Sequence, residues 1–156
     1  MGKKIIHTTI IPWIMSKGSK TPEEAKFFIT KKQEPINNQE NKQTKNEYLS
    51  SSIGEKVYNN DKNYEFDLNN NVIILAKPNG ITEGKVIILL DKTLDTFKSY
   101  TNDEILIKLN TTMAICGAKK GIYYIQKLNK KISIDFDSKM WETTLNKVKT
   151  WSEGLH

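Results

Sequence analysis

The spacing of apolar residues predicts helices in the early, central and final parts of the chain. Residues 21–33 (TPEEAKFFITKKQ) begin with a threonine cap, a proline at the first helical position and a glutamate three residues after the cap. Residues 102–118 and 137–151 carry apolar stripes at helical spacing, and Gly117 is a typical helix stop. A looser helical pattern predicts a further helix over residues 46–58.

Extended patterns occupy the stretches between these helices. Residues 64–68 alternate between polar and apolar, whereas residues 71–76 and 85–90 are continuous apolar runs, as buried strands are. Residues 77–84 separate the two runs and include a tight connection around residues 82–84, so we expect the runs to pair antiparallel.

The later strands and the order of elements define the expected fold class. Residues 121–128 and 131–137 are expected to form a second hairpin, whereas residues 33–46 hold almost no apolar side chain and predict a flexible polar loop. A chain of 156 residues has room for one domain with a core, so residues 1–156 are expected to be a single domain. The order predicts an α/β (α+β) fold with a mixed central sheet flanked by helices.

The charge adds a candidate partner. The net charge is +6, from 24 basic and 18 acidic residues, and every basic residue is a lysine. A basic protein suits nucleic acid, and without arginine its contacts would be salt-sensitive and independent of sequence. Abundant Lys, Asn and Ile without Arg is also the composition that an AT-rich genome produces, and both explanations stay open.

The composition also excludes several kinds of site. The single cysteine, Cys116, rules out an internal disulfide or a zinc site built from cysteines, and suits a small core residue. His7 and His156 lie at opposite ends, which disfavours a histidine metal centre or a Ser/His triad. No apolar run approaches the roughly 18 residues of a membrane span, and Pro12-Trp13 interrupts the only signal-like stretch. We therefore expect an intracellular protein, in the cytoplasm or nucleus of the host if it is viral, with no membrane contact.

Four segments, in order, carry a resemblance to a known family. They are a Pro-Trp pair ahead of a helix start, a helix with a glutamate, a Pro-Asn-Gly hairpin ending in a lysine, and a helix with a small residue and glycine before an aromatic strand, at residues 10–32, 41–58, 72–93 and 109–125. Together with a last helix at 141–151, they resemble the YqaJ viral recombinase family, the lambda-exonuclease-like branch of the PD-(D/E)XK nucleases. The resemblance implies a restriction-endonuclease-like core and a Mg²⁺- or Mn²⁺-dependent exodeoxyribonuclease.

The catalytic hairpin departs from the family pattern at two acids. Glu47 matches the helix glutamate and Lys92 matches the lysine that ends the motif. Asn79 stands where the family has a metal-binding aspartate, Leu90 stands where it has a glutamate, and Lys108 takes the position of a helix glutamine. A neutral amide and a leucine are poor replacements for carboxylates around a hard cation, so metal affinity should be low.

One acid near the hairpin offers a replacement ligand. Side chains alternate along a strand, so Asp91 should point away from the family's glutamate position unless a bulge or an early strand end turns it. With that turn, Glu47, Asn79 and Asp91 would form a weak metal site, assisted by Glu83 or Asp95. Without the family resemblance, Pro-Asn-Gly is an ordinary turn sequence.

The resemblance also implies a DNA-binding groove. Several lysines would line it: Lys77, Lys92, Lys108, Lys119 and Lys120. Trp13, Tyr123 and Tyr124 would either stack on bases or serve as core aromatics. Family members often assemble into rings, so a homo-oligomer or a viral protein partner is a further expectation.

Three functions stay open on the sequence. The first is a nucleic-acid-binding, catalytically impaired nuclease homologue in viral or mobile-element DNA processing or recombination. The second is an active metal-dependent exonuclease with a rearranged site. The third is a protein-interaction or regulatory module that has lost DNA binding, for which Phe27 and Phe28 are the candidate apolar patch.

Overall fold

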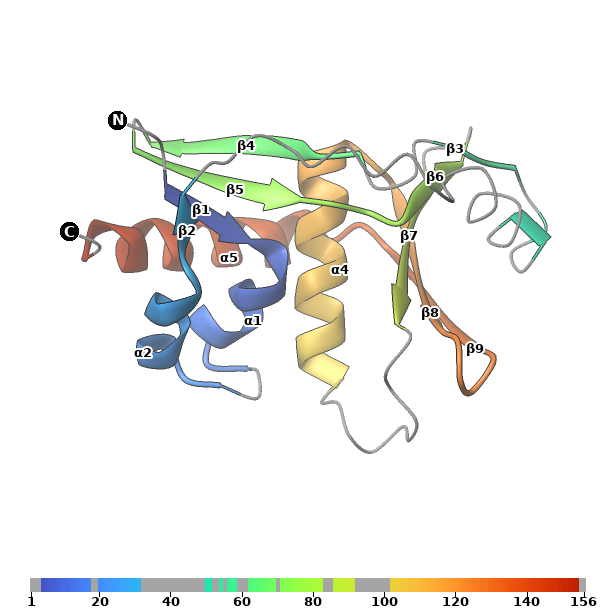
Figure 1. Cartoon of the computed structure of the whole chain (residues 1–156), viewed down its shortest axis with the longest axis horizontal. Coiled ribbons are helices and arrows are strands. Elements are labelled where there is room, and N and C mark those ends of the chain that lie inside the picture. Colours follow the sequence, from blue (N-terminus) through green and yellow to red (C-terminus); the bar gives the residue numbers. More distant parts are fainter. Residues whose placement is uncertain are drawn as a thin grey trace.

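Helix α4 (Asn102–Cys116) stands between two mixed β-sheets (Figure 1). The computed structural model describes residues 4–17, 20–31, 50–51, 54, 56–58, 62–69, 71–82, 86–91 and 102–154. Ile107 of α4 belongs to the core beside the first sheet, while Leu109 and Met113 belong to the core beside the second. The helix is therefore apolar on two sides, and it joins the two halves of the fold.

The first sheet has the strand order β2-β1-β5-β4. Its strands are β1 (Lys4–His7), β2 (Thr30–Lys31), β4 (Tyr64–Asn69) and β5 (Val72–Ala76). Strand β5 is parallel to β1 and antiparallel to β4, so both of its edges are occupied. It is one of the two interior strands of this sheet and is largely buried, which explains its continuous apolar sequence.

The second sheet has the strand order β3-β6-β7-β8-β9. Its strands are β3 (Val57–Tyr58), β6 (Gly80–Thr82), β7 (Val86–Asp91), β8 (Lys120–Ile125) and β9 (Lys130–Asp135). Strands β7 and β8 run parallel, and α4 provides the crossover between them. Strands β8 and β9 form the expected antiparallel hairpin.

The other helices cover the first sheet. They are α1 (Ile11–Ile14), α2 (Pro22–Ala25) and α5 (Ser138–Glu153). Helix α5 begins after Asp137, whose side chain accepts from Met140 N at 3.0 Å, and it buries Val148 in the first core. Among the described residues, none of the helices has the length and apolar character that crossing a bilayer requires.

Gly121 sets how closely α4 packs on β8. A Cβ atom at this position would lie 2.9 Å from Leu109 Cδ1 and 3.1 Å from Met113 Sδ. The close approach of α4 to the second sheet therefore depends on the missing side chain of Gly121.

Half-buried Cys116 packs against the same core, as expected, and burial raises its pKa to about 12.

The mixed α/β (α+β) class is confirmed, with the strands divided between two sheets. The expected pairing of residues 71–76 with 85–90 is wrong, because β1 and β4 already occupy both edges of β5. Strand β7 pairs instead with the short β6, in the register Gly80↔Ile88 and Ile81↔Ile87.

Two predicted helices are shorter than expected. Thr21 forms the predicted capping box with Glu24, but α2 ends at Ala25, and Thr30–Lys31 pairs with the edge of β1. In the segment 46–58, Val57–Tyr58 is a strand that pairs with β6, and Gly54 has a φ of +83°, which no helix continues through. The predicted loop at 33–46 lies outside the described residues.

Candidate functional site

The Pro-Asn-Gly turn lies beside the carboxyl end of β7. The backbone N–H of Asn79 donates to Ile88 O at 2.8 Å, and Asn79 Oδ1 accepts from the N–H of Leu90 at 2.7 Å. Half-buried Asn79 thus extends the pairing with β7 by one residue ahead of Gly80, where β6 begins. Its oxygen, at the position of the family's metal-binding aspartate, already serves a backbone donor.

Leu90 and Asp91 lie on opposite faces of β7. Leu90 packs with Val57 and Ile88 on one face. Asp91, only 8% exposed, accepts a hydrogen bond from the hydroxyl of Tyr123 on the face that packs against α4. Because β7 keeps an unbroken register with β8 from Val86 to Asp91, strand alternation holds to the end of the strand.

Helix α4 brings the ammonium of Lys108 within electrostatic range of Asp91. Burial lowers the pKa of the Lys108 ammonium, and the negative charges of Asp91 and Glu104 partly offset this effect. Glu104 lies one helical turn before Lys108 and accepts from Trp13 Nε1 at 3.1 Å. Lys108 therefore interacts electrostatically with two carboxylates, and each carboxylate also accepts from an aromatic donor.

Glu104 was not singled out from the sequence, and Tyr123 was named only as a base-stacking or core aromatic, not as a partner of Asp91. The four-residue spacing of Glu104 and Lys108 on one helix face was a usable signal. Tyr123 could be placed beside Asp91 only by knowing that β7 and β8 are parallel neighbours.

The remaining predicted residues are dispersed. Lys77 is exposed, two residues before Asn79, and its charge adds to burial in lowering the pKa of His7. Lys119 and Lys120 lie at the opposite end of the parallel pair, since Lys120 is in register with Val86 and Ile125 with Asp91. Five strand positions, roughly 16 Å, separate these ends.

Four acids and lysines named from the sequence fall outside the described residues: Glu47, Glu83, Lys92 and Asp95. The aromatic candidates, by contrast, are all described. Trp13, Tyr123 and Tyr124 are buried, so they are core aromatics, the alternative to base stacking.

The described residues do not fit a divalent metal centre. Among them, the acidic, histidine and cysteine side chains form no group of three or more that could hold an ion. Asp91 interacts electrostatically with the Lys108 ammonium and accepts a hydrogen bond from the Tyr123 hydroxyl, and Asn79 Oδ1 accepts from the backbone N–H of Leu90. Mg²⁺ needs several oxygen ligands in octahedral geometry, and a nearby ammonium opposes its binding.

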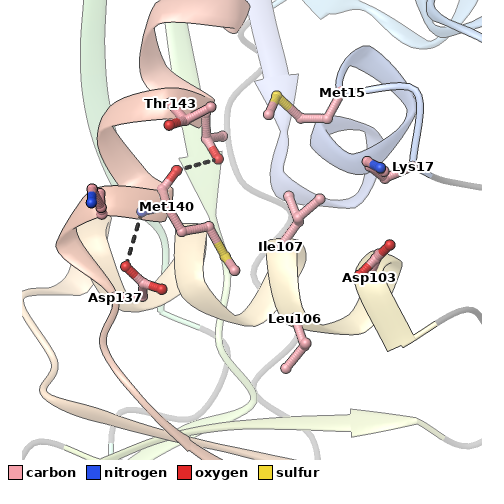
Figure 2. Close-up of a pocket in the computed structure, with 10 residues that line it drawn as sticks. Met15, Lys17, Asp103, Leu106, Ile107, Asp137, Met140 and Thr143 are labelled. Carbon is pink, nitrogen blue, oxygen red and sulfur yellow. Dashed lines mark hydrogen bonds between the residues drawn. The ribbon is translucent and has the colours of Figure 1, made fainter.

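A cavity of about 370 Å³ lies elsewhere, between the end of α1 and helices α4 and α5 (Figure 2). Its walls are mainly apolar, including Met15, Ile107 and Met140. Of its charged residues, Asp137 is engaged as the cap of α5. The cavity lies on the side of α4 that faces α1 and α5, and we assign it no part in the hairpin site.

The fold of this chain is similar to the folds of several solved exonucleases. The chain is similar to the alkaline exonuclease LHK-Exo of Laribacter hongkongensis, with a TM-score of 0.64, 13% identity, and coverage of 95% of this chain and 86% of that one. For LHK-Exo in complex with dAMP, the TM-score is 0.63 at 14% identity, with the same coverage. A phage-related exonuclease of Haemophilus somnus gives 0.56 at 9% identity, covering 94% of this chain and 91% of that one.

No protein-family model matches the chain, and no curated protein matches it. At these identities the likeness shows the fold alone. The chain has the nuclease-like fold of these exonucleases, which supports the resemblance at the level of the fold.

Proposed function

We propose that this chain is a nucleic-acid-binding homologue of the lambda-exonuclease-like nucleases, with an impaired catalytic hairpin. The observation that carries the proposal is that the side-chain oxygens of Asn79 and Asp91 already accept hydrogen bonds from the protein. Asn79 Oδ1 accepts from Leu90 N, and Asp91 accepts from Tyr123 beside the Lys108 ammonium. These groups stabilise the end of the sheet rather than remaining available to a metal ion.

The charge of the chain supports retention of binding. A net charge of +6 carried only by lysines favours the phosphate backbone over base edges. Such a protein would hold DNA ends or junctions, or block the access of a partner to them, during viral or mobile-element DNA processing or recombination. The nuclease-like fold supports this role, since the similar proteins are named as exonucleases and one was solved with dAMP.

The test is equilibrium binding of a fluorescein-labelled DNA duplex by anisotropy, with salt raised from about 50 to 200 mM. We expect saturable binding whose logarithmic affinity falls linearly with the logarithm of salt, and equal affinity for duplexes of unrelated sequence. A duplex that stays free at the lowest salt would overturn the proposal.

A second candidate, an active exonuclease, has one specific observation in its favour. Asp91 of β7 and Lys108 of α4 interact electrostatically, and an acid with a lysine is the pair of side-chain types that the family motif contains. It predicts shortening of end-labelled duplex with Mg²⁺ or Mn²⁺ and loss of that activity in Asp91→Ala. Our proposal predicts intact DNA with either metal.

A third candidate, a protein-interaction module, gains support from one side chain. Phe27 is 86% exposed, whereas Phe28 packs edge-on against Trp13 with ring centroids 5.1 Å apart. The predicted patch is therefore mainly Phe27. Failure of the DNA-binding test would favour this candidate.

A further inference from the structure

The turn that joins β8 to β9 lies beside the end of β7. The N–H of Gln126 donates to Asp91 O at 2.9 Å, which fastens the start of the turn to β7. Figure 1 shows the β7 arrowhead and this turn on the same side of the molecule. The turn is therefore part of the surroundings of the hairpin site.

Two hydrogen bonds fix the shape of this turn. The N–H of Asn129 donates to Gln126 O at 3.2 Å, and Tyr124 Oη donates to Asn129 Oδ1 at 2.8 Å. Asn129 has a φ of +48°, which asparagine tolerates better than most residues. The buried Tyr124 thus holds the turn from the core, so its flanking residues are presented in a fixed arrangement.

Three exposed lysines surround the turn: Lys127, Lys130 and Lys131. The residues opposite Lys130 and Lys131 in the register with β8 are Ile125 and Tyr124. At the other end of the hairpin, Lys120 is paired with Asp135. The register therefore opposes a lysine to an acid at one end of the hairpin and concentrates lysines at the other.

The register also gives the direction of each lysine. Lys130 is in register with Ile125, and Ile125 with Asp91, so Lys130 lies on the Asp91 face of the sheet. Lys131 is in register with Tyr124 and Leu90, so it lies on the opposite face. The positive charges thus surround the sheet end from both faces, roughly 10 Å from Asp91 across two strand spacings.

We propose that this basic turn (Lys127, Lys130 and Lys131) is the surface that contacts the phosphodiester backbone of nucleic acid, in place of Lys119 and Lys120. The inference rests on the proposed nucleic-acid binding and specifies where it occurs. Lysine ammonium groups are point charges suited to phosphate oxygens, and three of them on a fixed turn can follow successive phosphates without reading bases.

The experiment compares three variants in the anisotropy assay with DNA and RNA duplexes. The variants are Lys127→Ala/Lys130→Ala/Lys131→Ala, the charge-matched α5 variant Lys139→Ala/Lys147→Ala/Lys149→Ala, and Lys119→Ala/Lys120→Ala. All eight lysines changed in these three variants are exposed.

The turn variant should lose affinity on the order of tenfold at low salt, and its salt slope should fall by roughly two to three units. The two other variants should change the affinity much less, and thermal unfolding should show that all three remain folded.

Equal losses in the turn and α5 variants would mean that only total charge matters, which would overturn the inference. A larger loss in Lys119→Ala/Lys120→Ala would overturn it as well and restore the sequence prediction. Both results would leave the proposed nucleic-acid binding intact. If the unmodified protein binds neither duplex, the proposed function fails and the inference fails with it.

Discussion

The hydroxyl of Tyr123 donates to the carboxylate of Asp91 across the parallel pair β7–β8. Tyr123 is in register with Leu89, two positions before Asp91, so both side chains lie on the same face of the sheet. This bond places a nearly buried acid in the core beside α4. Asp91 therefore contributes to the structure of the sheet end, whatever chemistry the site retains.

Removing the Tyr123 hydroxyl should destabilise the protein. Tyr123→Phe leaves the Asp91 carboxylate without this donor, which typically costs about 1–3 kcal/mol in the free energy of unfolding. Tyr124→Phe is the matched control, because its partner Asn129 is exposed and can bond to water instead. Urea unfolding measures both, and equal costs for the two variants would contradict the role given to the Asp91 bond.

Adding one methyl group at Gly121 should also destabilise the protein. A Cβ there would press on Leu109 and Met113, and overpacking of this kind costs about 1–3 kcal/mol. Gly154→Ala is the control, because the nearest atom to its Cβ would be 3.5 Å away and its φ is −84°. Thermal unfolding should show a lowered midpoint for Gly121→Ala only. A similar midpoint for both variants would show that α4 can move away from β8 at little cost.

His7 should make stability depend on pH in the mildly acidic range. Burial, with the charge of Lys77, lowers the pKa of His7 from 6.5, so the unfolded chain binds a proton that the folded chain resists. Stability should therefore fall as the pH drops through 6.5 towards the lowered folded pKa. His7→Gln should remove this part of the pH dependence, and unfolding curves that keep the same pH dependence in the variant would exclude the effect.

Introducing two of the residues that the resemblance implies should create metal affinity. Asn79→Asp adds a carboxylate and Lys108→Gln removes the opposing ammonium, so the double variant should bind Mn²⁺ at least about tenfold more tightly than the unmodified protein. Calorimetry measures this without requiring activity. Equal binding by both proteins would show that Asn79 and Lys108 do not limit metal affinity.

Features set by a few neighbouring residues could be predicted from the sequence. The Thr21 capping box and the helix stop at Gly117, with a φ of +71°, depend on local bonds and backbone conformation, and both are present. The strands that pair with β5 could not be predicted, because β1, β4 and β7 could each form hydrogen bonds with its edges, and β1 and β4 occupy them. An apolar run of residues contains no information about that choice.

In the candidate site, too, features set by neighbouring residues were predictable and contacts between distant segments were not. The family resemblance pointed to the end of the hairpin and to Lys108 as parts of the site. Strand alternation correctly predicted that Asp91 and Leu90 lie on opposite faces of β7. The neighbours of Asp91 depend on the parallel pairing with β8 and on the rotation of α4. The bond of Tyr123 to Asp91 and the place of Glu104 beside Lys108 therefore emerge only from the structure, as does the basic turn beside β7.

The most direct test of the central claim is to incubate end-labelled duplex DNA with the protein and Mg²⁺ or Mn²⁺, then divide each sample between a native and a denaturing gel. We predict slower migration on the native gel and full-length DNA on the denaturing gel, with no difference for Glu47→Ala. Metal-dependent shortening that Glu47→Ala abolishes would contradict the account and show that the hairpin is a working nuclease site.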